Sequence, residues 1–201
     1  MPRIIKKYRE DAKKRIIAAA IEVADEKGLD GITLDAIAQN VGVSIPALYT
    51  YFENRDALLS ALVLEVVRKT QVGLESVFSQ DGDIRQKVEE LASLLFEERK
   101  SYTNIFFQLP VLVHQNPKAR DELSEIFHMI RVVIHDYLVR KKNEGMLSQK
   151  VDPDEATRII FAITIGLNFS SLVMELQDIH TIRKTWIDTV KRSLLIGIEQ
   201  G

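Results

Sequence analysis

Hydrophobic positions recur along nearly the whole chain at the spacing of amphipathic α-helices, and no stretch alternates convincingly at the two-residue period of a β-strand. The pattern therefore predicts an all-α protein. The expected helices cover residues 11–27, 34–41, a short stretch after Ser44, and residues 55–78, 84–98, 102–114, 117–143, 153–176 and 182–198. No internal repeat or low-complexity segment interrupts this series.

Several helix starts are marked by residues that favour capping. Thr33, Ser44 and Asn54 each precede a predicted helix, and their side chains can accept hydrogen bonds from the free N–H groups of a first turn. Asp152-Pro153 marks another start, because proline at the first helical position has no helical N–H bond to lose. We expect the boundary between two domains near Asn54, where the long fourth helix begins.

The second and third helices match the helix-turn-helix motif, in which two short helices are joined by a tight turn. The turn is Gly42-Val43-Ser44, and glycine at its start can adopt the backbone conformation that such a turn requires. Ala38 is small where the two helices must approach closely, and Leu48 fills the angle between them. The spacing therefore predicts a helix-turn-helix near the N-terminus.

A helical wheel separates two faces of the third helix. Leu48 and Phe52 point inward, with Ile45 beside them. The opposite face carries small or hydroxyl-bearing side chains between two tyrosines, and comprises Pro46, Ala47, Tyr49, Thr50 and Tyr51. Nothing on this face is charged, which is unusual for an ordinary surface and suits the major groove of DNA, where hydroxyls reach base edges and small apolar groups contact thymine methyls.

The same residues resemble the signature of the TetR family of bacterial and archaeal repressors. The resemblance is carried by residues 33–38, 42–44 and 48–59, and it is specific over about residues 14–63. Beyond that stretch it depends on the number and order of helices. It implies a helix-turn-helix DNA-binding domain over residues 1–53, and a helical ligand-binding and dimerisation domain over residues 54–201. It also implies a homodimer that represses transcription at a palindromic operator and is released by a small molecule.

The resemblance implies a role for each DNA-binding residue. Phosphate contacts are expected from Thr33, Ser44 and Arg55. The residues expected to face bases are Ile45, Pro46, Ala47 and Thr50, and those expected to contact the DNA backbone are Tyr49 and Tyr51. Two positions depart from the commonest pattern of the family, with Tyr51 in place of His and Arg55 in place of Lys, and both keep a donor. Ile45 and Ala47 are less polar than in many members, so we expect recognition of DNA shape to matter more.

The distribution of charge is compatible with DNA binding, although the net charge of −2 argues against it. Residues 1–15 carry seven basic and two acidic side chains, so the remainder of the chain is acidic. A basic segment of this kind can follow phosphates while the acidic body resists non-specific binding. The alternative is that this segment is simply a solvated first turn.

The C-terminal half carries the predicted ligand and dimer sites. Aromatic, apolar and a few polar side chains are the candidates for a pocket that takes an apolar small-molecule effector: Phe96, Tyr102, Phe106, Phe127, His128, Arg131, Phe161, Ile165, Asn168 and Phe169. Apolar residues of the last two helices are the candidates for the dimer interface: Phe169, Leu172, Val173, Leu176, Trp186, Val190 and Leu194. Core packing within a monomer is the alternative for these residues.

Other classes of function find little support. The chain has no cysteine, which excludes disulfides and Cys-ligated zinc, and it has none of the common enzyme motifs. His128 and His135 lie about 10 Å apart along a helix, too far for one metal, so we expect no metal, no cofactor and no enzymatic activity. The polar start and the lack of a long apolar stretch predict a cytoplasmic protein without membrane contact. A helical small-molecule carrier or protein-binding dimer is the remaining alternative.

Overall fold

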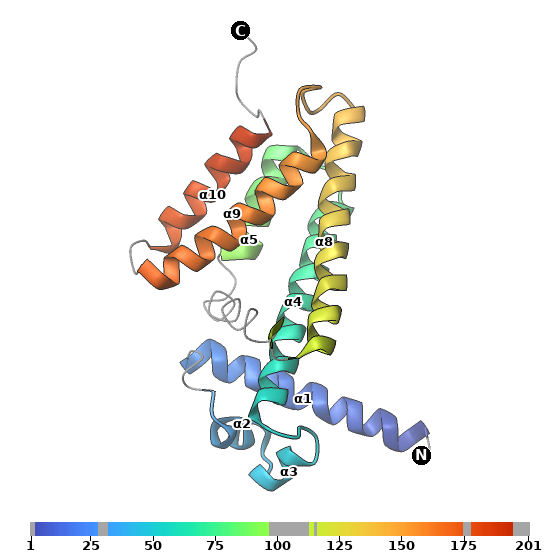
Figure 1. Cartoon of the computed structure of the whole chain (residues 1–201), viewed down its shortest axis with the longest axis vertical. Coiled ribbons are helices and arrows are strands. Elements are labelled where there is room, and N and C mark those ends of the chain that lie inside the picture. Colours follow the sequence, from blue (N-terminus) through green and yellow to red (C-terminus); the bar gives the residue numbers. More distant parts are fainter. Residues whose placement is uncertain (1–2, 28–31, 97–112, 115, 175–177, 195–201) are drawn as a thin grey trace. The chain divides into compact units, whose positions relative to one another are not determined.

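The computed structural model describes residues 3–27, 32–96, 113–114, 116–174 and 178–194, and this part of the chain contains helices and no strand. The all-α prediction is therefore confirmed. The helices, labelled in Figure 1, are α1 (Arg3–Lys27), α2 (Leu34–Val41), α3 (Ile45–Tyr49), α4 (Arg55–Ser79), α5 (Ile84–Phe96), α8 (Pro117–Asn143), α9 (Pro153–Met174) and α10 (Ile179–Ser193).

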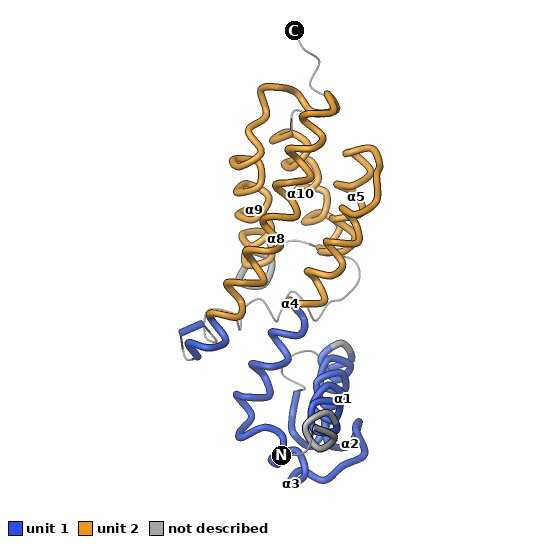
Figure 2. The backbone as a smooth tube through the Cα atoms, turned by 90° about the vertical axis from the view of Figure 1, so that its right-hand side faces the viewer, with its two compact units in different colours: residues 1–66, 99–120 blue, residues 67–98, 121–201 orange. Residues whose placement is uncertain are grey.

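The chain forms two compact units, coloured separately in Figure 2. Unit 1 comprises residues 1–66 and 99–120, and unit 2 comprises residues 67–98 and 121–201. Helix α4 supplies residues to both, since its first half belongs to unit 1 and the remainder to unit 2. One continuous helix therefore connects the helix-turn-helix to the helical C-terminal unit.

The core of unit 1 is made of small and branched apolar side chains. Residues of α1 that recur every three or four positions are buried, and they are Ile16, Ala19, Ala20, Val23 and Ala24. They belong to the same unit as Ile37 and Ala38 of α2, and α1 and α2 are in contact. Because alanine adds little bulk, α1 and α2 can pack closely, and this packing supports the helix-turn-helix.

The turn between α2 and α3 has the geometry expected from its glycine. Gly42 has φ 76° and ψ 36°, in the left-handed region where a side chain would be strained. Its N–H donates to the carbonyls of Ala38 and Gln39, and the N–H of Val43 donates to Ala38 at 2.9 Å. These bonds satisfy the last carbonyls of α2 and direct the chain into α3.

Helix starts agree with the predicted caps in most places. Thr33 Oγ1 accepts the N–H of Ala36 at 3.1 Å, and Asn54 Oδ1 accepts the N–H of Ala57 at 2.8 Å. Asp152 Oδ1 accepts the N–H of Asp154 at 2.9 Å. Ser44 is an exception, because it occupies the N-cap position of α3 but its side chain makes no cap hydrogen bond.

Two predicted helix starts are wrong. Helix α1 begins at Arg3 rather than at residue 11, because lysine and arginine favour helix even where no apolar pattern marks one. Helix α10 begins at Ile179 rather than at residue 182, because Asp178 is its N-cap and accepts the N–H of Thr181 at 2.8 Å. The predicted helix over 102–114 lies almost entirely outside the described residues, as do the predicted ends at 98, 176 and 198.

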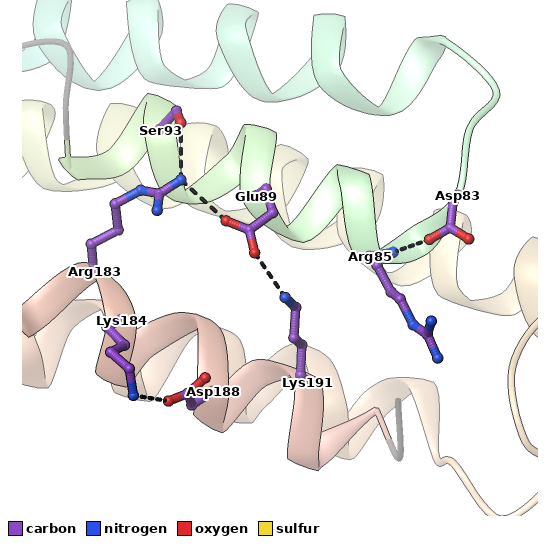
Figure 3. A network of polar contacts seen from close by, with 8 residues as sticks. All are labelled: Asp83, Arg85, Glu89, Ser93, Arg183, Lys184, Asp188 and Lys191. Atoms are coloured by element: carbon purple, nitrogen blue, oxygen red, sulfur yellow. Dashed lines mark hydrogen bonds and ion pairs between the residues drawn. The ribbon is translucent and has the colours of Figure 1, made fainter. Parts of the chain in front are cut away.

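Unit 2 is built around α10, which packs against both α5 and α9. Trp186 of α10 is fully buried, its ring lies 5.9 Å from that of Phe96, and its indole N–H donates to Thr164 Oγ1 at 2.8 Å. A polar network lies at the edge of the α5–α10 contact (Figure 3): Glu89 accepts from Arg183 at 3.1 Å and from Lys191 at 2.7 Å. One carboxylate therefore contacts α10 at two points about two turns apart.

Candidate DNA-binding surface

Helix α3 presents the outward face that the helical wheel predicts. Leu48 is 1% exposed and Phe52 is 7% exposed, so both belong to the core of unit 1. Tyr49 is 50% exposed, and Pro46 and Thr50 are also exposed. The remaining residues predicted to lie on or beside this face are half-buried, and they are Ile45, Ala47 and Tyr51. None of the predicted base-facing residues is buried, so the face is open to a large partner.

The polar groups at the start of α3 are available for such a partner. Ser44 is exposed, and its hydroxyl makes no capping bond, whereas its carbonyl accepts the N–H of Ala47 at 2.9 Å. Thr33, at the start of α2, is also exposed; its oxygen accepts a backbone N–H, which leaves its proton to be donated elsewhere. Both hydroxyls are therefore accessible to a phosphate. The phosphate contacts themselves stay a prediction.

Thr50, at the C-terminal end of α3, is held by two hydrogen bonds. Its hydroxyl donates to the carbonyl of Ala47 at 2.7 Å, and its own carbonyl accepts Arg9 Nη2 at 2.9 Å. With the hydroxyl proton used inside the helix, the outward side of Oγ1 presents lone pairs. Nothing in the spacing of the helix-turn-helix points to Arg9, because it lies 41 positions before Thr50 in the chain.

Basic side chains flank this face. Arg55 is exposed at the start of α4, and its Nη2 donates to the carbonyl of Ile32 at 3.4 Å. Lys13, one helical turn after Arg9 on α1, places its Nζ 5.9 Å from the centroid of the Phe52 ring. Arg9 and Lys13 of α1 therefore lie beside the C-terminal end of an uncharged helix, which suits a surface that meets phosphates at its rim and bases at its centre.

The predicted pocket residues that the structure describes differ in their exposure. Phe96 is buried against Trp186, and Asn168 is buried with its Nδ2 donating to the carbonyl of Thr164 at 2.8 Å. Phe127 and Phe161 do meet, with ring centroids 6.4 Å apart. The exposed members of the set are His128, Arg131, Ile165 and Phe169. Tyr102 and Phe106 lie outside the described residues.

Among the described residues of unit 2, two cavities are lined by residues outside the predicted pocket set. An open groove of about 570 Å³ runs between α4 and α5, and both polar and apolar surface lines it. A small apolar cavity of about 20 Å³ lies among α4, α5, α8, α9 and α10. The pocket expected among the aromatic residues therefore stays a prediction.

The predicted dimer interface needs a correction on α10. Trp186 and Val190 are 0% exposed and Leu194 is 2% exposed within the single chain, so they form the core of unit 2 and offer no surface to a second subunit. On α9, by contrast, Phe169 is 55% exposed. The side chains of Leu172 and Val173, and all of Leu176, lie outside the described residues.

Within the described ranges no group of three metal-binding side chains comes together, and no helix there is long and apolar enough to cross a membrane. Glu125 and His128, which are three residues apart on α8, are both exposed.

Known regulatory proteins match this chain most clearly in its DNA-binding unit. The family model described as "Bacterial regulatory proteins, tetR family" matches residues 16–62, which include α2, α3 and the start of α4. The tetracycline repressor protein class D of Escherichia coli is 39% identical over 57 residues, which are 28% of this chain and 26% of the repressor. Residues 16–62 therefore carry the DNA-binding domain of the TetR family. This is a family of regulatory proteins rather than enzymes, in agreement with the predicted lack of enzymatic activity.

Longer matches extend into unit 2. The transcriptional repressor BdcR of Escherichia coli strain K12 is 25% identical over 138 residues, which are 66% of this chain and 68% of that repressor. A TetR regulator from Haloarcula marismortui has the same fold, with a TM-score of 0.73 at 18% identity, covering 92% of this chain and 97% of that one. The match to the tetracycline repressor spans about a quarter of that protein, so it bears mainly on the DNA-binding unit.

Proposed function

We propose that this protein is a transcriptional repressor of the TetR family that binds a palindromic operator as a homodimer and leaves it when a small molecule binds. The observation that carries the proposal is the outer face of α3. Pro46, Tyr49 and Thr50 are exposed and uncharged on a helix whose other side is anchored by Leu48. A carrier of small molecules has no use for such a face, whereas a helix that enters the major groove requires it.

The second part of the proposal concerns the dimer. Operator palindromes reflect the two-fold symmetry of a dimer, with half-sites about 34–36 Å apart or a multiple of that distance. We assign the contact to the outer face of α9, where Ala162, Ile165, Gly166 and Phe169 are exposed at helical spacing. Two of these four residues are small and two are large and apolar, which suits close packing against a second helix.

The third part concerns release by a ligand. Solved structures with this fold hold choline in a Saccharomonospora viridis regulator and stearoyl-CoA in FadR of Bacillus subtilis, so the fold accepts different ligand chemistries. For this chain we propose an apolar effector, supported by the half-buried pair Phe127 and Phe161. Because α4 is continuous from one unit into the other, a ligand that displaces α4 would reach the DNA-binding unit. A coupling of ~1–3 kcal/mol would change operator affinity ~5–150-fold.

The test is selection of duplexes from a random-sequence library by the purified protein, followed by mobility shift. We expect enrichment of an inverted repeat. Thr50→Val should weaken binding to that repeat roughly fivefold, since one hydrogen bond contributes about 1 kcal/mol. Thr185→Val is the matched control, because Thr185 is an exposed threonine on α10.

Two results would contradict the proposal. A library from which no inverted repeat is enriched would favour the carrier or protein-binding alternative. Equal effects of Thr50→Val and Thr185→Val would show that DNA binds elsewhere than at α3.

A further inference from the structure

Helix α3 is too short to hold its own orientation. It has five residues, and a helix of this length in isolation has an unfavourable free energy of formation. Its position therefore depends on contacts with the rest of unit 1. Leu48 and Phe52 anchor it by burial, and both lie on the inner face. Burial alone resists separation from the core but leaves a short cylinder some freedom to rotate or slide, so a directional contact matters at its end.

The structure supplies that directional contact from α1. Thr50 is the C-cap residue of α3, and its carbonyl lies beyond the last bonds of the helix, where the N–H groups of Tyr51 and Phe52 both donate to Leu48. Arg9 Nη2 donates to the Thr50 carbonyl at 2.9 Å. A cation at a helix C-terminus also interacts favourably with the helix dipole. Lys13, one turn later on α1, lies over the Phe52 ring, so α1 contacts the end of α3 at two successive turns.

We infer that Arg9 is a positioning residue for the recognition face, and that it links a phosphate contact made by α1 to the orientation of α3. The inference depends on the proposed function. Arg9 is exposed, and a guanidinium has several N–H donors, of which one is used on Thr50. The others can meet a DNA phosphate while the carbonyl contact is kept. Arginine suits this double role better than lysine because its donors are fixed in a planar fork.

The first arm of the test is hydrogen exchange in the free protein, which requires no DNA. Arg9→Met removes the charge and the contact but keeps a long side chain that favours helix. We expect the amides of Leu48 to Phe52 to exchange on the order of 2- to 10-fold faster, while those of α2 are unchanged. Arg15→Met is the matched control, since Arg15 is an exposed arginine on the same helix, and it should leave α3 unchanged.

The second arm uses the duplex selected by the wild type and an unrelated duplex of equal length. Arg9→Met removes the proposed phosphate contact, so it should reduce the dependence of binding on salt, whereas Arg15→Met removes a charge to which no phosphate contact is assigned and should reduce it less. The ratio of specific to non-specific affinity should fall about 3- to 10-fold in Arg9→Met and stay unchanged in Arg15→Met. Arg9→Lys, which keeps the charge but carries its donors on one nitrogen atom rather than in a planar fork, should recover the salt dependence fully and the ratio in part.

The outcomes separate this inference from the proposed function. Equal exchange of α3 in the two methionine variants overturns the inference whatever the DNA results are. An affinity ratio that Arg9→Met leaves unchanged also overturns it, because Arg9 would then hold the helix without affecting recognition. If the wild type selects no duplex, the proposed function fails and the inference fails with it, and the exchange experiment still shows whether Arg9 holds α3.

Discussion

Single residues show how the chain satisfies polar groups that its sequence places in apolar surroundings. Thr164 and Asn168 lie within the most apolar helix, where they need partners or a ligand. The structure supplies partners from the chain itself: Thr164 Oγ1 accepts from Trp186 and donates to the carbonyl of Ile160 at 2.6 Å, and Asn168 donates to the carbonyl of Thr164. These residues therefore account for packing between α9 and α10 and give no evidence of a bound molecule.

Tyr137 is the contrasting case, and it leads to a stability prediction. Its hydroxyl is buried and has no hydrogen-bond partner among the described residues, and burial raises its pKa. The ring itself is well packed, 4.7 Å from that of Phe78. Tyr137→Phe removes only the unpartnered group, so the free energy of unfolding should stay the same or rise by up to about 1 kcal/mol.

Urea denaturation would measure this effect, with Tyr49→Phe as the control, because the Tyr49 side chain is half exposed and its hydroxyl can bond to water. A loss of more than about 1 kcal/mol in Tyr137→Phe alone would show that the hydroxyl has a bound water or another partner.

Most helices begin at a residue whose side chain caps the first turn, and most of these caps could be predicted from the sequence. Thr33, Asn54 and Asp152 act as predicted because each bonds to a backbone N–H two or three residues ahead. Asp178 performs the same role for α10 and was overlooked, since the apolar pattern of that helix starts later. The start of α1 differs from the prediction for a similar reason, because its first turns are rich in basic residues and carry no apolar pattern.

The cap of α10 should respond to pH. The N–H of Thr181 donates to the Asp178 carboxylate and is the main reason why the pKa of that carboxyl lies below its usual value. A depressed pKa means that the ionised cap stabilises the folded helix above the ordinary pKa, and that this contribution is lost as the pH falls through the depressed value. The Thr181 amide resonance should therefore titrate with a midpoint below the usual range of aspartate.

Asp178→Asn is the control for this titration, because asparagine caps a helix without titrating. Its Thr181 amide should show no such transition. A wild-type midpoint at or above the ordinary value for aspartate would mean that the capping bond is absent in solution.

At the scale of the whole molecule, two apolar helical stripes with similar sequence patterns differ in burial. The stripe on α10, which includes Val190, forms the core of unit 2, whereas Ile165 on α9 is 54% exposed. Periodicity alone does not distinguish these cases, because it reports that a face is apolar and not what covers it. The stripe on α10 is therefore covered within one subunit, whereas the exposed face of α9 is open to the proposed contact with a second subunit.

The two stripes predict different outcomes for the same kind of mutation. Ile165→Glu should leave the fold intact and convert a dimer to a monomer in sedimentation experiments, because a charge would be buried only in the dimer. Val190→Asp should instead destabilise the subunit by several kcal/mol, since it places a charge in the core. Ile179→Glu on α10 is the control for Ile165→Glu, because Ile179 is 39% exposed and lies outside the proposed contact. A wild type that sediments as a monomer, or an Ile165→Glu variant that stays dimeric, would contradict the proposed interface.

The amino-acid sequence by itself determined the features that depend on neighbours along the chain. These are the helical class, most helix caps, the left-handed turn at Gly42, and the inner and outer faces of α3, because each follows from interactions within a few residues. Tertiary structure alone decided which apolar stripe is covered and which cation meets α3. Val190 is buried, and Arg9 reaches Thr50 across 41 positions, through packing between helices far apart in the chain. Local periodicity carries no information about such pairings, since the same helix could bury its stripe against several different partners.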